Sequence, residues 1–329
     1  MPDNNKPVVL ITHKLPDDWI SLLVDKCQLF VGPPDATELA SSLDKKLPQA
    51  EGLFTLLTIQ VTQAMLDKAP KLRVISNMAV GVDNIDLDAC TARKIPVGNT
   101  PEVLTESTAD LTMALLLSAA RNLPQAQKDA REGRWKTWSP AGWLGIELAG
   151  STLGIIGMGK IGKAVAKRAL AFGMNILFTD PNPIIFPNAK QVSLSEILPK
   201  SDFISLHTPL TKETRCIIDR DAFSMMKSHA ILVNAARGPL VDTAALFEAL
   251  SDHRVFAAAL DVTDPEPLPP MHPLYDLPNC LIVPHIGSAT EYTRKQMAEL
   301  ACKNLLAGLY GERVPHCVNP EVYLKNSRD

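Results

Sequence analysis

The sequence lacks the features that mark disulfide-rich, zinc-binding, membrane-spanning and nucleic-acid-binding proteins. Its six cysteines stand far apart and form no CxxC pair, so they are expected to be buried thiols in a reducing compartment, with no metal site. No apolar run is long enough to cross a bilayer, and the short apolar run after the N-terminus predicts a strand rather than a signal peptide. The net charge is −3, without a long basic run. A cytoplasmic protein that binds neither nucleic acid nor a membrane is therefore expected.

What the chain does contain is a regular alternation of short β-rich apolar runs with amphipathic stretches. With 329 residues and 46% apolar content, it is long enough for two domains with separate cores. The first group of runs covers residues 8–12, 27–32, 52–57, 73–80 and 95–98. A second group covers residues 151–157, 174–180, 202–207, 230–236, 255–262 and 280–285. This order predicts βαβ units and parallel sheets, the second with six strands.

The connections between the two groups suggest how the domains are built. One long helix over residues 99–123 is expected to link them, and a helix over residues 289–310 is expected to return to the first domain. The predicted fold is α/β, with two doubly wound parallel-sheet domains. A Rossmann NAD-binding domain, residues 101–287, is inserted in a discontinuous flavodoxin-like substrate domain, residues 1–100 and 288–329.

A glycine motif, Gly157-x-Gly159-x-x-Gly162, stands between an apolar run and a helical stretch. In this context the first glycine allows a tight turn, the second lets a pyrophosphate approach the backbone, and the third lets helix and strand pack closely. The N-terminus of the following helix would face the phosphates with its free N–H groups. The alternative is a tight turn without a ligand.

Asp180 ends the next apolar run, at the spacing expected for an acidic residue that binds the adenosine ribose. The alternative is a turn residue before Pro181. No Arg or Lys occurs at residues 181–189 to bind a 2′-phosphate. NAD(H) is therefore favoured as the cofactor, and NADP(H) stays possible.

Polar residues gather where the strands of the second group are expected to end, and open α/β sheets bind ligands at that edge. These residues are His207, Arg237, Asp261, Glu266 and His285. Each has a simpler explanation: Arg237 can close a helix, Glu266 can be a solvated loop acid, and His285 can cap a strand. Together with a dinucleotide loop, they favour a catalytic site.

Hydride transfer to a 2-keto acid is the chemistry that these residues can share. Arginine offers a planar donor pair to a carboxylate. A histidine can donate the proton that the developing alkoxide needs, and a neighbouring carboxylate favours its charged form. We therefore expect His285 as the acid/base, Glu266 as its partner and Arg237 as the substrate anchor.

At this point the sequence resembles the D-isomer-specific 2-hydroxyacid dehydrogenases, and among them most the glyoxylate/hydroxypyruvate reductases. The stretches that carry the resemblance are MAVGVDNIDL, NTPEVLTESTADLTMALLL, GIIGMGKIG, NAARGPLVD, ALDVTDPEPLP and PHIGSAT. The resemblance implies NAD(P)H-dependent reduction of glyoxylate or hydroxypyruvate to the D-2-hydroxy acid by a homodimer that is joined through the second domain and a Trp-rich arm at residues 131–145.

The resemblance also implies further site residues. For the substrate these are the backbone amides of Val80 and Gly81, with Leu57, Trp138, Arg237, Ser288 and His285. For the cofactor they are Thr108, Gly157, Met158, Gly159, Lys160, Ile161, Gly162, Asp180, His207, Thr208, Pro209, Ala235, Ala236, Arg237, Asp261, His285 and Gly287.

Other interpretations stay open. One is a different D-2-hydroxyacid dehydrogenase, for example of the phosphoglycerate type. Another is an NAD-sensing binding protein like the corepressors of this fold, although the chain has no long polar tail. Trp138 is expected to contact a second subunit near its active-site mouth, because exposed tryptophans are costly without a partner. The alternative is that the arm tryptophans all pack within their own chain.

Overall fold

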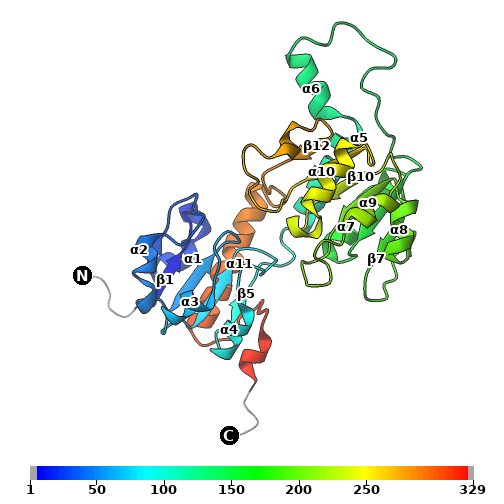
Figure 1. Cartoon of the computed structure of the whole chain (residues 1–329). Coiled ribbons are helices and arrows are strands. Elements are labelled where there is room, and N and C mark those ends of the chain that lie inside the picture. The colour runs from blue at the N-terminus through cyan, green and yellow to red at the C-terminus, as the bar shows by residue number, and fades with distance from the viewer. Residues whose placement is uncertain (1–5, 325–329) are drawn as a thin grey trace. The chain divides into compact units, whose positions relative to one another are not determined.

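The computed structural model describes residues 6–324 and divides into two compact units (Figure 1). Unit 1 comprises Met1–Leu104 and Thr290–Asp329, and unit 2 comprises Thr105–Ala289. The expected boundaries at 100/101 and 287/288 do not coincide with these divisions. The predicted fold class is confirmed, because each unit is built on a parallel sheet with helices against it.

Unit 1 has a five-stranded sheet with the order β2-β1-β3-β4-β5, the flavodoxin-like order. Its strands are β1 (Val8–Ile11), β2 (Gln28–Val31), β3 (Gly52–Thr55), β4 (Val74–Asn77) and β5 (Val97–Gly98). Its helices are α1 (Ser21–Val24), α2 (Ser41–Asp44), α3 (Gln63–Asp67), α4 (Leu87–Ala92) and α11 (Glu291–Leu309). The predicted return of the last helix is confirmed, because α11 packs on β3 and β4. Gly308 permits this approach, since a Cβ there would lie 2.5 Å from the Val74 side chain.

Unit 2 has a seven-stranded sheet with the order β12-β11-β10-β9-β6-β7-β8. Its strands are β6 (Thr152–Ile156), β7 (Asn175–Thr179), β8 (Ala189–Gln191), β9 (Phe203–Leu206), β10 (Ile231–Asn234), β11 (Ala257–Leu260) and β12 (Cys280–Ile282). Its helices are α5 (Thr105–Ala120), α6 (Leu123–Arg131), α7 (Lys160–Ala171), α8 (Leu194–Lys200), α9 (Arg220–Met225) and α10 (Thr243–Ser251). The strand order reverses between β6 and β9, and the carboxyl ends of the strands on either side of this point form the ligand crevice of such sheets.

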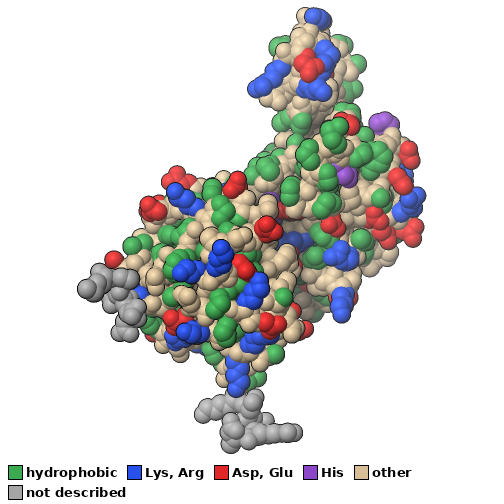
Figure 2. Space-filling view, turned by 60° about the vertical axis from the view of Figure 1, so that its left-hand side comes forward, with side chains coloured by type: hydrophobic (Ala, Val, Ile, Leu, Met, Phe, Trp, Pro, Cys, Tyr) green, Lys and Arg blue, Asp and Glu red, His purple; other side chains and the backbone are tan. Residues whose placement is uncertain are grey.

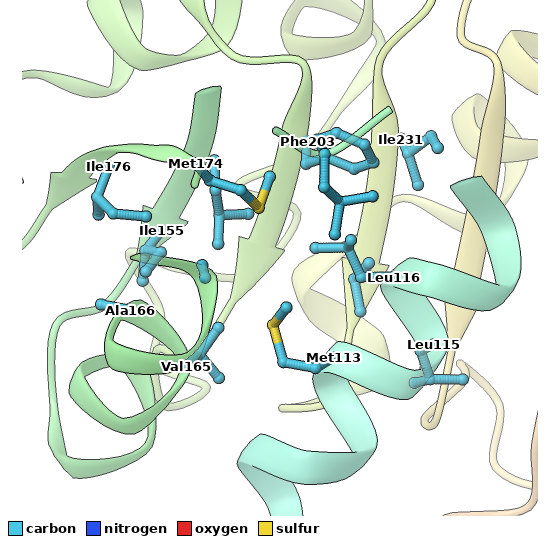
Figure 3. Packing of buried hydrophobic residues seen from close by; sticks show 14 of the residues in the cluster. Met113, Leu115, Leu116, Ile155, Val165, Ala166, Met174, Ile176, Phe203 and Ile231 are labelled. Carbon is cyan, nitrogen blue, oxygen red and sulfur yellow. The ribbon is translucent and has the colours of Figure 1, made fainter. Parts of the chain in front are cut away.

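Apolar layers cover both faces of the unit 2 sheet. On one face, α5 and α7 pack on the central strands through Met113, Leu116, Val165 and Phe203 (Figure 3). The neighbouring Ile204 belongs to the second layer, with α8, α9 and α10, because successive side chains of a strand point to opposite faces. Full burial of each such side chain contributes roughly 1.5–3 kcal/mol, so the edge that carries the strand ends is held rigidly.

Two predictions about elements of this region were wrong. The linking helix starts at Thr105 rather than near residue 100, because Glu102 has a φ of 74° and the chain turns there. It ends at Ala120, because Asn122 is left-handed (φ 51°) and Pro124 begins a new helix, α6. The sequence also missed β8, an edge strand that carries Lys190 and has no apolar run.

The expectation that all six cysteines are buried was also wrong. Cys27, Cys90 and Cys302 are buried, whereas Cys280 and Cys317 are partly exposed and Cys216 is exposed. Cys216 has a φ of 52° and lies in a tight turn, so its side chain has no core to enter. All six thiols are free.

The arm, residues 131–145, follows α6, and the two extend together from unit 2 (Figure 1). Asp129 folds the arm back onto α6, because its carboxylate accepts hydrogen bonds from Trp143 Nε1 (2.8 Å), Arg134 Nε (2.8 Å) and Gln125 Nε2 (2.7 Å). The Trp143 hydrogen bond is the largest of the causes that lower the pKa of Asp129. Trp138 stays 80% exposed. Elsewhere on the face drawn in Figure 2, acidic and basic side chains are interspersed.

His207, just beyond β9, is partly buried, and its backbone lies against Gly157 of the glycine loop. Its Nε2 lies 2.8 Å from Ser205 Oγ, whereas its buried Nδ1 has no hydrogen-bond partner among the described residues. Burial lowers the pKa of His207 to about 4. The folded protein therefore keeps this ring neutral at physiological pH.

The lowered pKa of His207 predicts a specific loss of stability in acid. The unfolded chain takes up a proton below its ordinary pKa of about 6.5, but the folded chain takes it up only below about 4. Stability is therefore complete above pH 6.5 and falls as the pH drops toward 4, by roughly 2–3 kcal/mol between pH 7.5 and pH 4.5. Urea unfolding of the wild type and of His207→Gln at both pH values measures the contribution of His207 to the free energy of unfolding. The contributions of the carboxylates cancel in this comparison, because both proteins contain them. A parallel loss in the two proteins would contradict it.

Candidate active site

His285 and Glu266 form a hydrogen-bonded pair beyond the carboxyl ends of β11 and β12. His285 Nδ1 donates to Glu266 Oε1 at 2.5 Å. The two side chains are 29% and 33% exposed, so a small molecule can reach them. With Nδ1 held by the carboxylate, Nε2 is the ring nitrogen left to exchange a proton with a substrate.

Asp261 fixes the backbone that presents His285. Its buried carboxylate accepts the N–H of Ile286 at Oδ1 (2.6 Å) and that of Gly287 at Oδ2 (2.9 Å). Its carbonyl accepts the N–H of His285 (2.9 Å), which has a left-handed φ of 51°. Burial raises the pKa of the Asp261 carboxyl, and the N–H of Ile286 opposes that shift. Asp261 therefore accepts three hydrogen bonds, which hold His285 in a conformation that non-glycine residues rarely adopt.

Arg237 lies in the turn after β10, next to the Glu266 loop. Buried Asn234 shapes this turn, because its Nδ2 donates to Arg237 O (2.8 Å) and its Oδ1 accepts the N–H of Ala236 (3.1 Å). Gly238 passes so close to the loop after β11 that a Cβ would lie 1.8 Å from the carbonyl oxygen of Thr263. Glu266 Oε2 in turn accepts the N–H of Thr263 (3.4 Å). The structure thus brings Arg237, Glu266 and His285 to one part of the sheet edge.

The glycine loop joins β6 to α7 at the same edge, beside the reversal of strand order. Gly157 has a φ of 95°, and a Cβ there would lie 2.7 Å from the His207 backbone. A Cβ at Gly162 would lie 2.2 Å from Gly157 O, whereas one at Gly159 would meet nothing within 4 Å. The open space at Gly159 and the N-terminus of α7 therefore fit a pyrophosphate.

Asp180, at the end of β7, supports this loop directly. Its Oδ2 accepts the N–H of Met158 (2.9 Å), and its Oδ1 accepts the N–H of Asn182 (3.0 Å). Oδ1 also accepts from Asn182 Nδ2 (3.4 Å), so the second lone pair of Oδ2 is the acceptor capacity left for a ribose hydroxyl.

The other predicted residues of unit 2 divide into three groups. Thr108 is buried against the His285 turn, and its Oγ1 donates to Gly287 O (3.3 Å). Lys160 and Ile161 form the first turn of α7, and the remaining residues lie in the strand-end loops; these are Thr208, Pro209, Ala235, Ala236 and Ser288. Trp138 lies outside this cluster, on the arm.

Two predicted residues of unit 1 lie in the loop after β4. Val80 is 39% exposed and Gly81 is partly exposed, and Leu57, in the loop after β3, is 36% exposed. They are accessible at the carboxyl edge of their own sheet.

Sequence reasoning missed residues that act through hydrogen bonds to backbone. Asn234 and Asn77 each fall within an apolar run of the sequence, and neither is predicted as a site residue. An asparagine at the end of a buried strand is the available signal, because a buried amide needs partners and usually finds them in the adjoining turn.

Residues 6–324 contain neither a cluster suited to a metal ion nor a helix suited to a membrane. No group of three or more His, Cys, Asp or Glu side chains in this range is placed to hold a metal ion. No helix within it has both the length and the apolar character needed to cross a membrane.

Comparisons with known proteins agree with this geometry. Residues 113–287 match the family described as D-isomer specific 2-hydroxyacid dehydrogenase, NAD binding domain. A glyoxylate reductase of Thermococcus litoralis is 43% identical over 96% of this chain and 98% of its own. The crystal structure of a Thermus thermophilus protein is 48% identical, with a TM-score of 0.89 over 94% of this chain and 99% of that one.

A third relative shows which cofactor class occurs among the similar structures. It is the NADPH-dependent glyoxylate/hydroxypyruvate reductase of Sinorhizobium meliloti, solved with NADP and malonate, which is 29% identical with a TM-score of 0.86 over 98% of this chain and all of that one. The matched family domain is described as NAD-binding, so the cofactor is a nicotinamide dinucleotide. The chain belongs to the D-isomer-specific 2-hydroxyacid dehydrogenase family and is an NAD(P)-dependent oxidoreductase that reduces a 2-keto acid.

Proposed function

We propose that the protein reduces glyoxylate to glycolate and hydroxypyruvate to D-glycerate, the D-2-hydroxy acid. The observation that carries this proposal is the 2.5 Å hydrogen bond between His285 and Glu266, beside Arg237 and at the edge that carries the glycine loop. The names of the relatives support the substrate class, since glyoxylate is the substrate in the name of the 43% identical protein.

Each polar side chain has a distinct part in the proposed reaction. Arg237 binds the substrate carboxylate with its guanidinium. A bound reduced nicotinamide supplies the hydride. His285 donates its Nε2 proton to the carbonyl oxygen as negative charge develops there, and the Glu266 carboxylate stabilises the ring while it is charged.

Further contacts are proposed for both ligands. The N–H groups of Val80 and Gly81 bind the substrate carboxylate, and Leu57 and Ser288 line its site. Trp138 contacts a second subunit near the mouth of that subunit's site. The cofactor is held by the glycine loop and the first turn of α7, residues 157–162, by Asp180, and by further residues of unit 2. They are Thr108, His207, Thr208, Pro209, Ala235, Ala236, Asp261 and Gly287.

Replacing His285 tests the proposed chemistry. His285→Ala should lower kcat with glyoxylate and hydroxypyruvate roughly 10²–10⁴-fold, the usual contribution of general acid–base catalysis, and leave the Kd for NADH nearly unchanged. NADH oxidation and NADH fluorescence measure the two quantities. His229→Ala is a matched control, because His229 also pairs with a carboxylate (Asp202, 2.8 Å) in unit 2 but lies before β10, away from the strand ends.

Three outcomes would change the proposal. A near-normal kcat in His285→Ala would remove His285 from its role. A wild type that accepts only phosphorylated keto acids would favour a phosphoglycerate-type enzyme. A wild type that binds NADH but turns over no keto acid would favour an NAD-sensing binding protein.

Asp180 should make the enzyme prefer NADH to NADPH. A 2′-phosphate at ~4 Å from this carboxylate would cost ~4 kcal/mol at an effective dielectric of ~20, and roughly 1–3 kcal/mol after screening by solvent and salt. That corresponds to roughly 5- to 150-fold in kcat/KM. The ratio of kcat/KM for the two cofactors should shift toward NADPH in Asp180→Asn, and a general loss of stability would cancel in this ratio. Equal or better use of NADPH by the wild type, or an unchanged ratio in the variant, would contradict the assignment.

We also propose a cytoplasmic homodimer that is joined through unit 2 and the arm. Trp135 and Trp138 are 62% and 80% exposed, which is costly for side chains of this size unless a second copy covers them. The Trp135→Ser/Trp138→Ser variant should dissociate at least ~30-fold more readily, because buried tryptophans at an interface contribute about 2 kcal/mol or more each. Sedimentation velocity across a dilution series measures this, with Ile185→Ser as control for the loss of an exposed apolar side chain elsewhere in unit 2. A monomeric wild type, or an equally dimeric double variant, would contradict the proposal.

A further inference from the structure

In the loop after β4, three consecutive carbonyl groups accept hydrogen bonds, whereas the N–H groups of residues 79–82 donate none to the described residues. Ala79 O accepts the N–H of Thr100 (2.9 Å), Val80 O accepts from Asn99 Nδ2 (2.8 Å), and Gly81 O accepts from Asn77 Nδ2 (3.0 Å). Within residues 6–324, nothing accepts a hydrogen bond from the N–H of Val80 or of Gly81.

The planar peptide bond fixes the direction in which the N–H groups of Val80 and Gly81 point. The N–H of Val80 shares a peptide with Ala79 O, and the N–H of Gly81 shares one with Val80 O. These peptides are trans, so each N–H points away from the partner that holds its carbonyl. Two neighbouring N–H groups fixed in this way form a site for an anion.

Asn77 holds the peptide that follows Gly81, and a second buried asparagine, Asn84, holds Asn77. Asn77 is fully buried, and its Nδ2 donates both to Gly81 O and to Asn84 Oδ1 (3.1 Å). Asn84 Nδ2 donates in turn to Leu56 O (3.2 Å) and Ile59 O (3.0 Å), in the loop after β3. Turning either amide over would set oxygen against oxygen, so this pair of amides has only one favourable orientation.

Asn99 fixes the other side of Gly81, and α11 supports it. The carbonyl of Asn99 accepts from Nδ2 of the buried Asn304 (2.8 Å), and its N–H donates to His316 O (3.1 Å). The side chain of Asn99 is therefore presented to Val80 O by a backbone that is held on both sides. The peptides before and after Gly81 are thus each anchored by a different asparagine.

We propose that Asn77 and Asn99 are positioning residues for substrate binding. Asn99 holds the peptide that carries the Gly81 N–H, and Asn77 holds the next peptide along the chain, so that the loop keeps its Val80 and Gly81 N–H groups ready for a carboxylate. This inference rests on the proposed function, in which those N–H groups bind the substrate carboxylate. The asparagines touch the loop rather than the substrate, so their loss should weaken carboxylate binding more than it lowers kcat and should leave the cofactor site in unit 2 unchanged.

The test measures carboxylate binding apart from turnover, with oxalate as the probe and NADH-saturated protein. Asn99→Ser and Asn77→Ser should each raise the Kd for oxalate and the KM for glyoxylate at least ~10-fold, with the Kd for NADH within twofold of the wild type. Asn99 is partly exposed, so its variant keeps the test usable if Asn77→Ser fails to fold. Asn319→Ser is the matched control, because Asn319 is equally buried and bonds Val97 N and Ile95 O in unit 1 without touching the loop. Its Tm should fall, while its oxalate Kd should stay within twofold.

The possible results separate the two proposals. Unchanged oxalate Kd and glyoxylate KM in both asparagine variants, with an active wild type, would overturn the positioning role alone. An equal loss of oxalate binding in Asn319→Ser would overturn it as well, since general destabilisation would then explain the effect. A wild type that reduces neither keto acid would overturn the proposed function, and one that also fails to bind oxalate would remove the carboxylate site from this loop.

Discussion

The carboxylate of Asp261 holds the turn on which the candidate site depends. It accepts two consecutive N–H groups, those of Ile286 and Gly287, while its own carbonyl accepts the N–H of His285. A hydrogen bond to a charged group contributes roughly 1.5–3 kcal/mol, which is of the size needed to hold a histidine at a positive φ. The His285 ring reaches Glu266 because this turn is made, and Gly287 is small because it packs between Asp261 and Thr108.

Three other strand-end loops are also held by hydrogen bonds between a side chain and the backbone. Asn234 shapes the Arg237 turn, Asp180 braces the glycine loop through Met158, and Asn77 holds Gly81. In each case a side chain at a strand end satisfies the adjoining backbone, so the loop keeps one conformation without a core of its own. These hydrogen bonds explain how short loops on a rigid sheet edge can present groups with the precision that catalysis requires.

The sequence predicted the fold well where its signals are physical requirements. Alternating apolar runs specify the parallel sheets, and the glycine spacing specifies the turn between β6 and α7. Signals that depend on tertiary context were weaker. The apolar run over residues 111–120 favours one continuous helix, and Pro124 is the local signal that a helix ends before it. β8 has no apolar run because it lies at an edge.

The candidate site shows the same division. Arg237, Glu266 and His285 could be predicted because each follows an apolar strand, and parallel strands end at one edge. The asparagines could not be assigned partners, since their hydrogen bonds join segments that are distant in sequence. Asn304 and Asn99, for example, meet only because α11 returns to the sheet of unit 1.

In the proposed reaction, hydride is delivered to the carbonyl carbon of a keto acid while His285 protonates the carbonyl oxygen. The stereochemistry and isotope content of the product test this reaction directly. Hydroxypyruvate reduced with NADH deuterated at the transferable position can be analysed by chiral chromatography and mass spectrometry. The account predicts D-glycerate with one deuterium at carbon 2. L-glycerate, a product without deuterium, or no product at all would contradict it.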